Sequence, residues 1–195
     1  MTGLTAWDAL FPERGRRLTP GDTVLVLGSG GVSIFALQFA LRSGARVIAT
    51  TSSAAKVEKL NKMGAHHVIN YTKDPNWSEA AKKQIPDGRG VNFVIETGGA
   101  TTLTQSMAAT HIDSQVAMVG FMHGQGGWSL ALRVLCTIRQ IQVGSRDLFE
   151  EINRAVECNC LEPIINKVFA FEQAADALKY LESGEHIGKV VIEIK

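Results

Sequence analysis

A glycine-rich turn between two apolar segments is the part of this sequence best suited to chemistry. Residues 23–27, TVLVL, are typical of a buried strand, and the run GSGGVS at 28–33 follows and opens an apolar helix. In such a turn Gly28 permits a tight bend, and Gly30 lets a phosphate approach the backbone. The helix N-terminus offers free N–H groups and the positive end of its dipole. The pattern predicts a dinucleotide pyrophosphate here, although Ser33 replaces the third glycine of the usual fingerprint; a turn that binds nothing is the alternative.

The end of the second predicted strand indicates which dinucleotide is favoured. NAD sites usually carry an acidic residue about 20 positions beyond the glycines, where it bonds the ribose 2′-hydroxyl. Here the strand runs into TTSSAAK, and the first carboxylate is Glu58, inside the next predicted helix. The hydroxyls of Ser52 and Ser53 and the ammonium of Lys56 suit a 2′-phosphate, which a carboxylate would repel. The pattern favours NADP(H), and the alternative is that Lys56 only faces solvent.

Alternating strand-like and helix-like segments position this turn. The strand-like segments are short, rich in Val and Ile, and apolar on both faces, as parallel strands covered by helices are. They are residues 23–27, 46–50, 67–70, 91–96, 115–120 and 141–144, with a last strand in KVVIEI near the C-terminus. Helical patterns separate them. We therefore predict an α/β fold, a doubly wound parallel sheet of Rossmann type in a single domain.

That predicted domain has three parts. Residues 1–22 are a lead-in with a short amphipathic helix, and residues 23–145 are the Rossmann nucleotide-binding core. Residues 146–195 add C-terminal helices, in RDLFEEINRAVE and EQAADALKYLESG, and a last strand that completes the same domain.

Composition excludes several classes of protein. The chain has 195 residues and a net charge of +1, so it has no electrostatic footprint for nucleic acid or an anionic membrane. No apolar run approaches the roughly 20 residues that span a bilayer, and no secretory leader is recognisable. Cys136, Cys158 and Cys160 form no disulfide framework and have no histidine at ligand spacing. We expect a cytoplasmic protein without zinc that acts on a small molecule.

Six segments together resemble the zinc-type alcohol dehydrogenase and quinone reductase branch of the medium-chain dehydrogenase/reductase superfamily. They are GLTAWDALF, GDTVLVLGSGGVSIFALQFA, GAHHVINY, VIETGG, VGSRDLFEEINRAVE and ALKYLESGEHIGKVVIEI. The resemblance covers essentially the whole chain and is specific as an ordered set. It implies hydride transfer to or from a carbonyl, an enone or a quinone-like substrate, with NADP(H) as cofactor.

The resemblance also implies where the cofactor lies. The residues are Gly28, Gly30, Gly31 and Val32 at the pyrophosphate, Ser52, Ser53 and Lys56 at the 2′-phosphate, Tyr71 beside the adenine, Thr97 and Gly98 at the ribose, and Gly120, Phe121, Ser145 and Arg146 toward the nicotinamide. It further implies a homodimer through the sixth strand, at residues 140–144.

Members of that branch carry an N-terminal catalytic domain that polarises the substrate carbonyl, whereas this chain begins in the helix that follows it. No zinc ligands are therefore carried over. Within the chain, Arg146 is a candidate to stabilise an oxyanion, and His123 is a candidate proton donor. Both have plainer interpretations, as a cofactor contact and an exposed loop residue.

Two other functions stay open. One alternative is a nucleotide-binding module without redox turnover, and the other is a non-redox isomerase or cyclase that uses the open cleft. In the latter case the apolar loop at residues 126–135 would line a hydrophobic pocket.

Overall fold

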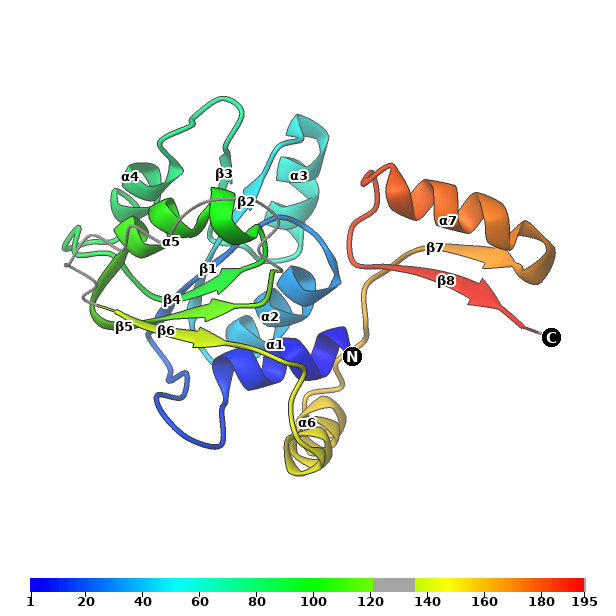
Figure 1. Cartoon of the computed structure of the whole chain (residues 1–195), viewed down its shortest axis with the longest axis horizontal. Coiled ribbons are helices and arrows are strands. Elements are labelled where there is room, and N and C mark those ends of the chain that lie inside the picture. Colours follow the sequence, from blue (N-terminus) through cyan, green and yellow to red (C-terminus); the bar gives the residue numbers. More distant parts are fainter. Residues whose placement is uncertain (121–135, 195) are drawn as a thin grey trace.

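A six-stranded parallel sheet forms the centre of the molecule (Figure 1). The computed structural model describes residues 1–120 and 136–194. The strands are β1 (Thr23–Val26), β2 (Arg46–Thr51), β3 (His67–Asn70), β4 (Val91–Glu96), β5 (Thr110–Met118) and β6 (Thr137–Gln140). Their order is β3-β2-β1-β4-β5-β6, which is the order of a doubly wound dinucleotide-binding sheet. The predicted fold class is confirmed.

The sixth strand lies earlier in the sequence than predicted. β6 pairs with the end of β5 from Thr137 to Gln140, and the prediction of a strand at 141–144 was wrong. The backbone explains the error, because Val143 and Gly144 have φ angles of 67° and 136°. These left-handed values cannot continue a strand. The apolar side chains of that segment serve packing, since Ile141 is buried in the core.

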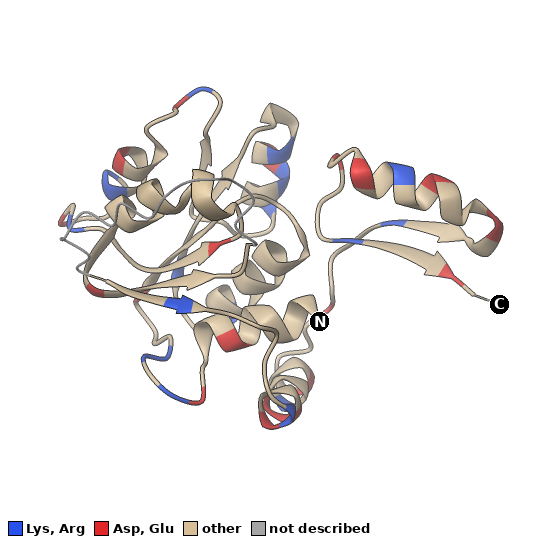
Figure 2. Ribbon diagram, in the orientation of Figure 1, with Lys and Arg blue, Asp and Glu red and all other residues tan. Residues whose placement is uncertain are grey.

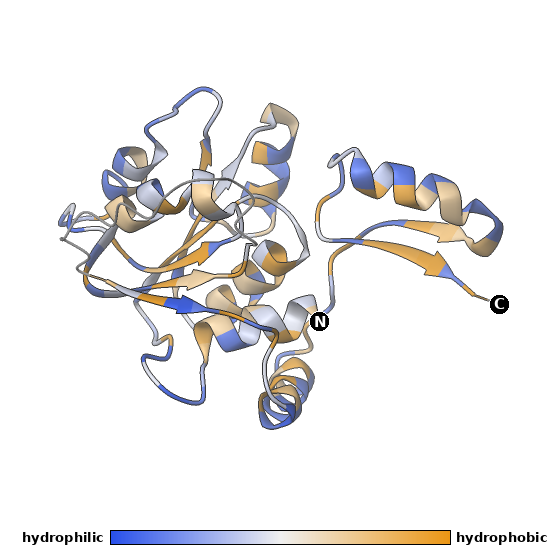
Figure 3. Ribbon diagram, viewed as in Figure 1, coloured by the Kyte–Doolittle hydropathy of each residue, from blue (hydrophilic) through white to orange (hydrophobic). Residues whose placement is uncertain are grey.

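Helices cover both faces of the sheet. On one face lie α1 (Thr2–Leu10), α2 (Gly31–Arg42), α3 (Ala54–Lys62) and α6 (Arg146–Cys158). On the other lie α4 (Trp77–Lys82) and α5 (Leu103–Ala109), preceded by the short 3-10 helix η1 (Gly99–Thr101). The sheet is the middle layer of three, so the central strands β1 and β4 contribute apolar side chains to a core on each face. Figure 3 shows the hydrophobic residues of these strands in orange.

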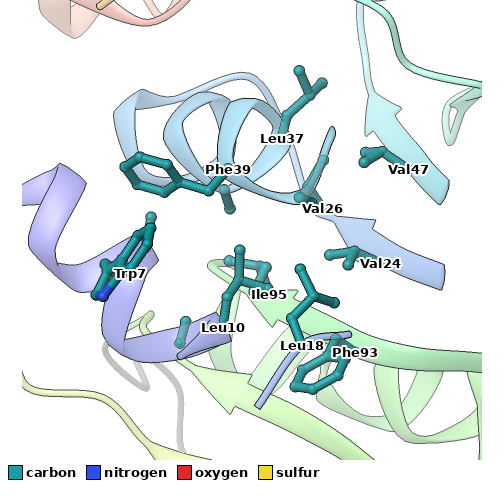
Figure 4. Close-up of a cluster of buried hydrophobic side chains, with 14 of the residues drawn as sticks. Trp7, Leu10, Leu18, Val24, Val26, Leu37, Phe39, Val47, Phe93 and Ile95 are labelled. Carbon is teal, nitrogen blue, oxygen red and sulfur yellow. The ribbon is translucent and has the colours of Figure 1, made fainter. Parts of the chain in front are cut away.

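The strand at the centre supplies both cores. Val24 and Val26 point to the face of α1 and α2, whereas Leu25 and Leu27 point to the opposite face. This alternation follows from the two-residue period of a strand. In the first core, Trp7 of α1 packs its indole edge-on against Phe39 of α2, with ring centroids 5.1 Å apart (Figure 4). This contact holds the C-terminal half of α2 against α1.

A second, smaller sheet stands beside the first. β8 (Lys189–Glu193) is the predicted last strand, and it pairs in parallel with β7 (Ile165–Ala170), which the sequence analysis did not predict. The short 3-10 helix η2 (Phe171–Gln173) and α7 (Ala174–Glu182) connect the two strands. This C-terminal unit, residues 165–193, lies to one side of the main sheet (Figure 1), and it exposes apolar residues such as Val168 and Leu178. That it completes the same domain stays a prediction.

Candidate functional site

The predicted glycine turn lies at the carboxyl end of β1, where the strand order changes direction between β2 and β4. Ligands of open α/β sheets bind at such a switch point. Gly28 has φ +73°, a value that favours glycine, and its N–H donates to Thr50 Oγ1 over 3.2 Å. Gly30 is the N-cap of α2 and makes no side-chain cap bond. The N–H groups of the first turn of α2 therefore point outward, available to an anion.

Two hydroxyls hold the turn in place. Ser33 Oγ donates to Leu27 O over 2.6 Å, and Thr97 Oγ1 donates to the same carbonyl over 2.9 Å. Ser33 is buried, so the residue that replaces the third glycine serves as an internal tie. Val32 is half-buried and packs against the core. It therefore positions the helix while the neighbouring glycines present the backbone.

A cleft of about 360 Å³ opens beside the turn. Its lining residues are Leu27, Gly28, Thr50, Tyr71, Trp77, Thr97, Gly98, Thr101 and Thr102. The structure therefore brings four predicted contact residues together, namely Gly28, Tyr71, Thr97 and Gly98. Tyr71 is 40% exposed at the mouth, whereas Trp77 is buried and was missed by the sequence analysis. Two aromatic rings in a largely apolar cleft suit a planar heterocycle.

A buried carboxylate shapes one wall of that cleft. Glu96, at the end of β4, accepts hydrogen bonds at Oε1 from Gly98 N over 2.7 Å and Gly99 N over 3.0 Å. Thr102 Oγ1 donates to the same oxygen over 2.6 Å, and Ser106 Oγ donates to Oε2. A buried carboxylate is stable only when so fully bonded. Glu96 thus fixes the turn of Thr97 and Gly98, a role that the strand pattern VNFVIE conceals.

Gly120 is needed for close approach. A Cβ at Gly120 would lie 2.6 Å from Thr97 O, so a larger residue would displace the turn at Thr97. Phe121 and His123, predicted near the nicotinamide and as a proton donor, lie outside the described residues.

The residues predicted at the 2′-phosphate divide into two groups. Ser52 is exposed, and Ser53 is the N-cap of α3 without a side-chain cap bond, so both are available to a ligand. Lys56 instead points to the glycine turn. Its Nζ donates to Ser29 Oγ over 3.1 Å, to Gly184 O over 2.6 Å and to His186 O over 3.0 Å.

Basic residues from the C-terminal unit reach the same turn. A Cβ at Gly31 would lie 2.8 Å from Lys189 Nζ, so this ammonium lies over the first residue of α2. Burial lowers the pKa of Lys189, and burial together with the charges of Lys56 and Lys189 lowers the pKa of His186. Figure 2 marks the basic residues on α3 and at the start of β8. Because Lys189 is far from the turn in sequence, no local motif could have found it.

Ser145 and Arg146 lie elsewhere, at the start of α6. Ser145 Oγ accepts from Leu148 N over 3.2 Å, as a helix N-cap does, and donates to Glu13. Arg146 is exposed and pairs with Glu150 over 3.0 Å. The structure does not bring either residue to the cleft beside Thr97. Their contact with the nicotinamide, and a catalytic role of Arg146, stay predictions.

Within residues 1–120 and 136–194, no three His, Cys, Asp or Glu side chains gather closely enough to hold a metal ion. None of the helices in these two ranges has the length and apolar character required to cross a membrane.

Comparison with known proteins places this arrangement in a family. Residues 31–157 match the family model described as zinc-binding dehydrogenase. That match spans most of the chain, so the chain belongs to the zinc-binding dehydrogenase family. It corresponds to the cofactor-binding part of a medium-chain dehydrogenase, as the sequence resemblance predicted.

Individual relatives agree. A zinc-type alcohol dehydrogenase-like protein of Schizosaccharomyces pombe is 43% identical over 198 residues, which cover 98% of this chain and 57% of that protein. The crotonyl-CoA reductase of Streptomyces collinus is 28% identical over 206 residues, with 95% and 46% covered. The chain thus spans about half the length of the relatives it matches.

Solved structures show the same fold. A structure described as a putative alcohol dehydrogenase from Sinorhizobium meliloti superposes with a TM-score of 0.88 at 34% identity, over 99% of this chain and 56% of that one. A crotonyl-CoA carboxylase/reductase in complex with NADP gives a TM-score of 0.84 at 20% identity, over 99% and 55%. At that lower identity the likeness concerns the fold alone.

The position of Lys189 over Gly31 can be tested by filling that space. In Gly31→Ala, the new Cβ displaces Lys189 Nζ, and loss of this charge-assisted contact is expected to weaken ADP binding roughly tenfold. Fold stability should hold, since alanine favours a helix more than glycine does. Calorimetric titration with ADP measures the affinity, and thermal unfolding measures stability. Unchanged ADP affinity would contradict a role of Lys189 at the turn.

The lowered pKa of His186 predicts a pH dependence of stability. Its Nδ1 is buried without a hydrogen-bond partner in the described part of the chain, so protonation there is costly. The unfolded chain binds a proton near pH 6.5, before the folded chain does. The free energy of unfolding should therefore fall as the pH drops from 7.5 through 6.5. Urea titrations should show a smaller fall in His186→Gln; equal falls in both proteins would refute the assignment.

Proposed function

We propose that this chain is the nucleotide-binding part of an NADP(H)-dependent oxidoreductase that transfers hydride to or from a carbonyl, an enone or a quinone-like substrate. One observation carries the proposal. The uncapped N-terminus of α2, the Lys189 ammonium and an aromatic-walled cleft meet at the switch point of a dinucleotide-binding sheet. Membership in the zinc-binding dehydrogenase family supports the same reaction class.

The chain's own residues divide the binding work. The backbone of Gly30 and Gly31 and the ammonium of Lys189 hold the pyrophosphate, where the negative charge meets both a helix dipole and a cation. Tyr71 and Trp77 flank the adenine side of the cleft, and the turn at Thr97, held by Glu96, borders the ribose. Bound in this way, the nicotinamide supplies the hydride chemistry.

NADP(H) is favoured over NAD(H) by charge. No carboxylate lies at the end of β2, where NAD-binding sites usually place one, and Thr50 and Thr51 there are buried. Ser52 and the uncapped first turn of α3 behind Ser53 face the position of a 2′-phosphate. A crotonyl-CoA carboxylase/reductase of the same fold is in complex with NADP, whereas another structure of this fold is described as an NAD-dependent alcohol dehydrogenase, so the preference rests on the residues at the end of β2.

The substrate class follows from the relatives and not from this chain's cleft. An alcohol dehydrogenase-like relative favours a carbonyl, and a crotonyl-CoA reductase favours an activated alkene. Arg146 and His123 stay candidates for carbonyl polarisation and proton donation. A small-molecule substrate and a cytoplasmic location are part of this proposal.

A homodimer through the edge of the main sheet is also proposed. β6 is an edge strand of the sheet, and Thr137 and Gln140 are exposed at its ends. Such an edge offers unpaired backbone groups to a second copy, although the contact falls at 137–140 instead of the predicted 140–144. Sedimentation of the purified chain measures its oligomeric state.

Cofactor preference gives the first test. Titration of the chain with NADPH and NADH, followed by fluorescence, should show tighter binding of NADPH. In Ser52→Asp, a carboxylate faces the 2′-phosphate, and NADPH affinity should fall at least about tenfold while NADH affinity is retained. Ser52→Asn is the matched control, because it has nearly the same size without the charge. Binding of neither nucleotide to the wild-type chain would refute the proposal.

Turnover gives the second part of that test. Loss of NADPH absorbance with an enone, a quinone or an aldehyde would support the oxidoreductase. Binding without loss of absorbance would favour the nucleotide-binding module, and conversion of an apolar substrate without cofactor consumption would favour the isomerase or cyclase.

A further inference from the structure

We infer that Lys56 is a positioning residue of the pyrophosphate site, acting by locking residues 184–189 onto the glycine turn, and that it does not read the 2′-phosphate. This inference rests on the proposed function for its ligand. It replaces the role that the sequence pattern suggested for this lysine, and it concerns a contact between segments far apart in the chain.

The hydrogen bonds of Lys56 are complete without a ligand. A lysine ammonium has three donors and no acceptor. Its Nζ lies 3.1 Å from Ser29 Oγ, 2.6 Å from Gly184 O and 3.0 Å from His186 O. All three donors are therefore used inside the protein. A 2′-phosphate could gain this ammonium only by breaking bonds that are already formed.

The acceptors of Lys56 belong to two separate parts of the molecule. Ser29 is in the glycine turn, whereas Gly184 and His186 are in the loop between α7 and β8. A backbone bond runs parallel to this contact, since Gly188 N donates to Ser29 O over 3.1 Å. The loop from Gly184 to Gly188 is therefore bonded at its start to Lys56 and at its end to Ser29 of the turn.

The next residue along the chain is Lys189. Its backbone N–H donates to Ile164 O over 2.9 Å, and its Nζ lies over Gly31 at the start of α2. The position of this ammonium therefore depends on where the loop ends. Holding the loop by Lys56 places the Lys189 charge in front of the turn before a ligand arrives, which is preorganisation for an anion.

Charge explains why a lock is needed. The Lys189 ammonium approaches the positive end of the α2 dipole, where a cation is unfavourable. Without an anion, this repulsion drives the loop away from the turn. The carbonyls of Gly184 and His186, which lie beyond the end of α7, accept from Lys56 and counteract it. The Lys56 ammonium thus binds the loop through the carbonyl groups of Gly184 and His186, and the charge of Lys189 stays available to an anion.

The two roles of Lys56 predict different ligand dependences. A residue that reads the 2′-phosphate affects NADPH and adenosine 2′-phosphate and leaves NADH alone. A residue that positions Lys189 affects NADPH and NADH equally, because both carry a pyrophosphate, and leaves adenosine 2′-phosphate unaffected.

The test uses the full chain with three variants. Lys56→Met removes the ammonium donors and keeps the length of the side chain, whereas Lys56→Arg keeps the positive charge. Lys59→Met is the matched control, because Lys59 lies three residues further along α3 and its side chain is exposed. The affinities for NADPH, NADH and adenosine 2′-phosphate are measured by calorimetry. Amide hydrogen exchange of residues 184–189 is measured without any nucleotide.

In Lys56→Met, we expect NADPH and NADH each to bind roughly tenfold more weakly, with adenosine 2′-phosphate unchanged. Exchange at Gly188 and Lys189 should accelerate in Lys56→Met and recover at least in part in Lys56→Arg. Lys59→Met should match the wild type in both measurements. Loss of NADPH and adenosine 2′-phosphate with NADH retained would overturn the inference.

The exchange measurement separates this inference from the proposed function. If the wild type binds neither dinucleotide, the proposed function fails, and hydrogen exchange alone tests whether Lys56 holds residues 184–189 on the glycine turn. Unchanged exchange in Lys56→Met overturns the inference, and faster exchange confined to residues 184–189 supports it.

Discussion

The N–H groups in the first turn of α2 receive no hydrogen bond acceptor from a side chain of the N-cap residue, Gly30. The other features of the site lie around these free N–H groups. The turn must be tight at Gly28 and open in front of Gly30. Ser33 and Thr97 hold the carbonyl of Leu27 behind it, and the aromatic contact of Trp7 with Phe39 anchors the helix from the core. An uncapped helix terminus is costly in an empty protein and useful when an anion occupies it.

Two separate charge arrangements border that terminus. At the end of β4, the Glu96 carboxyl group accepts hydrogen bonds from backbone N–H groups and hydroxyls, and these bonds shape the turn at Thr97 and Gly98. At the start of α2, Lys56 donates to neutral oxygens and the Lys189 ammonium lies over Gly31. The site thus has a fully hydrogen-bonded carboxyl group at the end of β4 and two lysine side chains beside the glycine turn.

Sequence reasoning recovered what is local and missed what is distant. Parallel strands with two apolar faces and the glycine turn have short-range signatures, and both were predicted. The sequence analysis missed β7 because apolar and polar residues alternate only weakly in INKVFA, and among the described strands it pairs with β8 alone. It misplaced the last strand of the main sheet because Val143 has a left-handed backbone conformation. Glu96, Trp77 and Lys189 carry no pattern of their own, and their roles arise only when the chain folds back on itself.

The bond from Gly188 N to Ser29 O makes the small sheet and the glycine turn parts of one equilibrium. Coupling between two sites is reciprocal. If a well-ordered β7–β8 unit strengthens anion binding at the turn, then anion binding stabilises the ordered state of that unit by the same free energy. An anion bound at the turn would therefore also restrict the motion of that unit, whose exposed apolar residues include Val168 and Leu178. Binding at the turn would in this way change the behaviour of a surface that lies away from the turn.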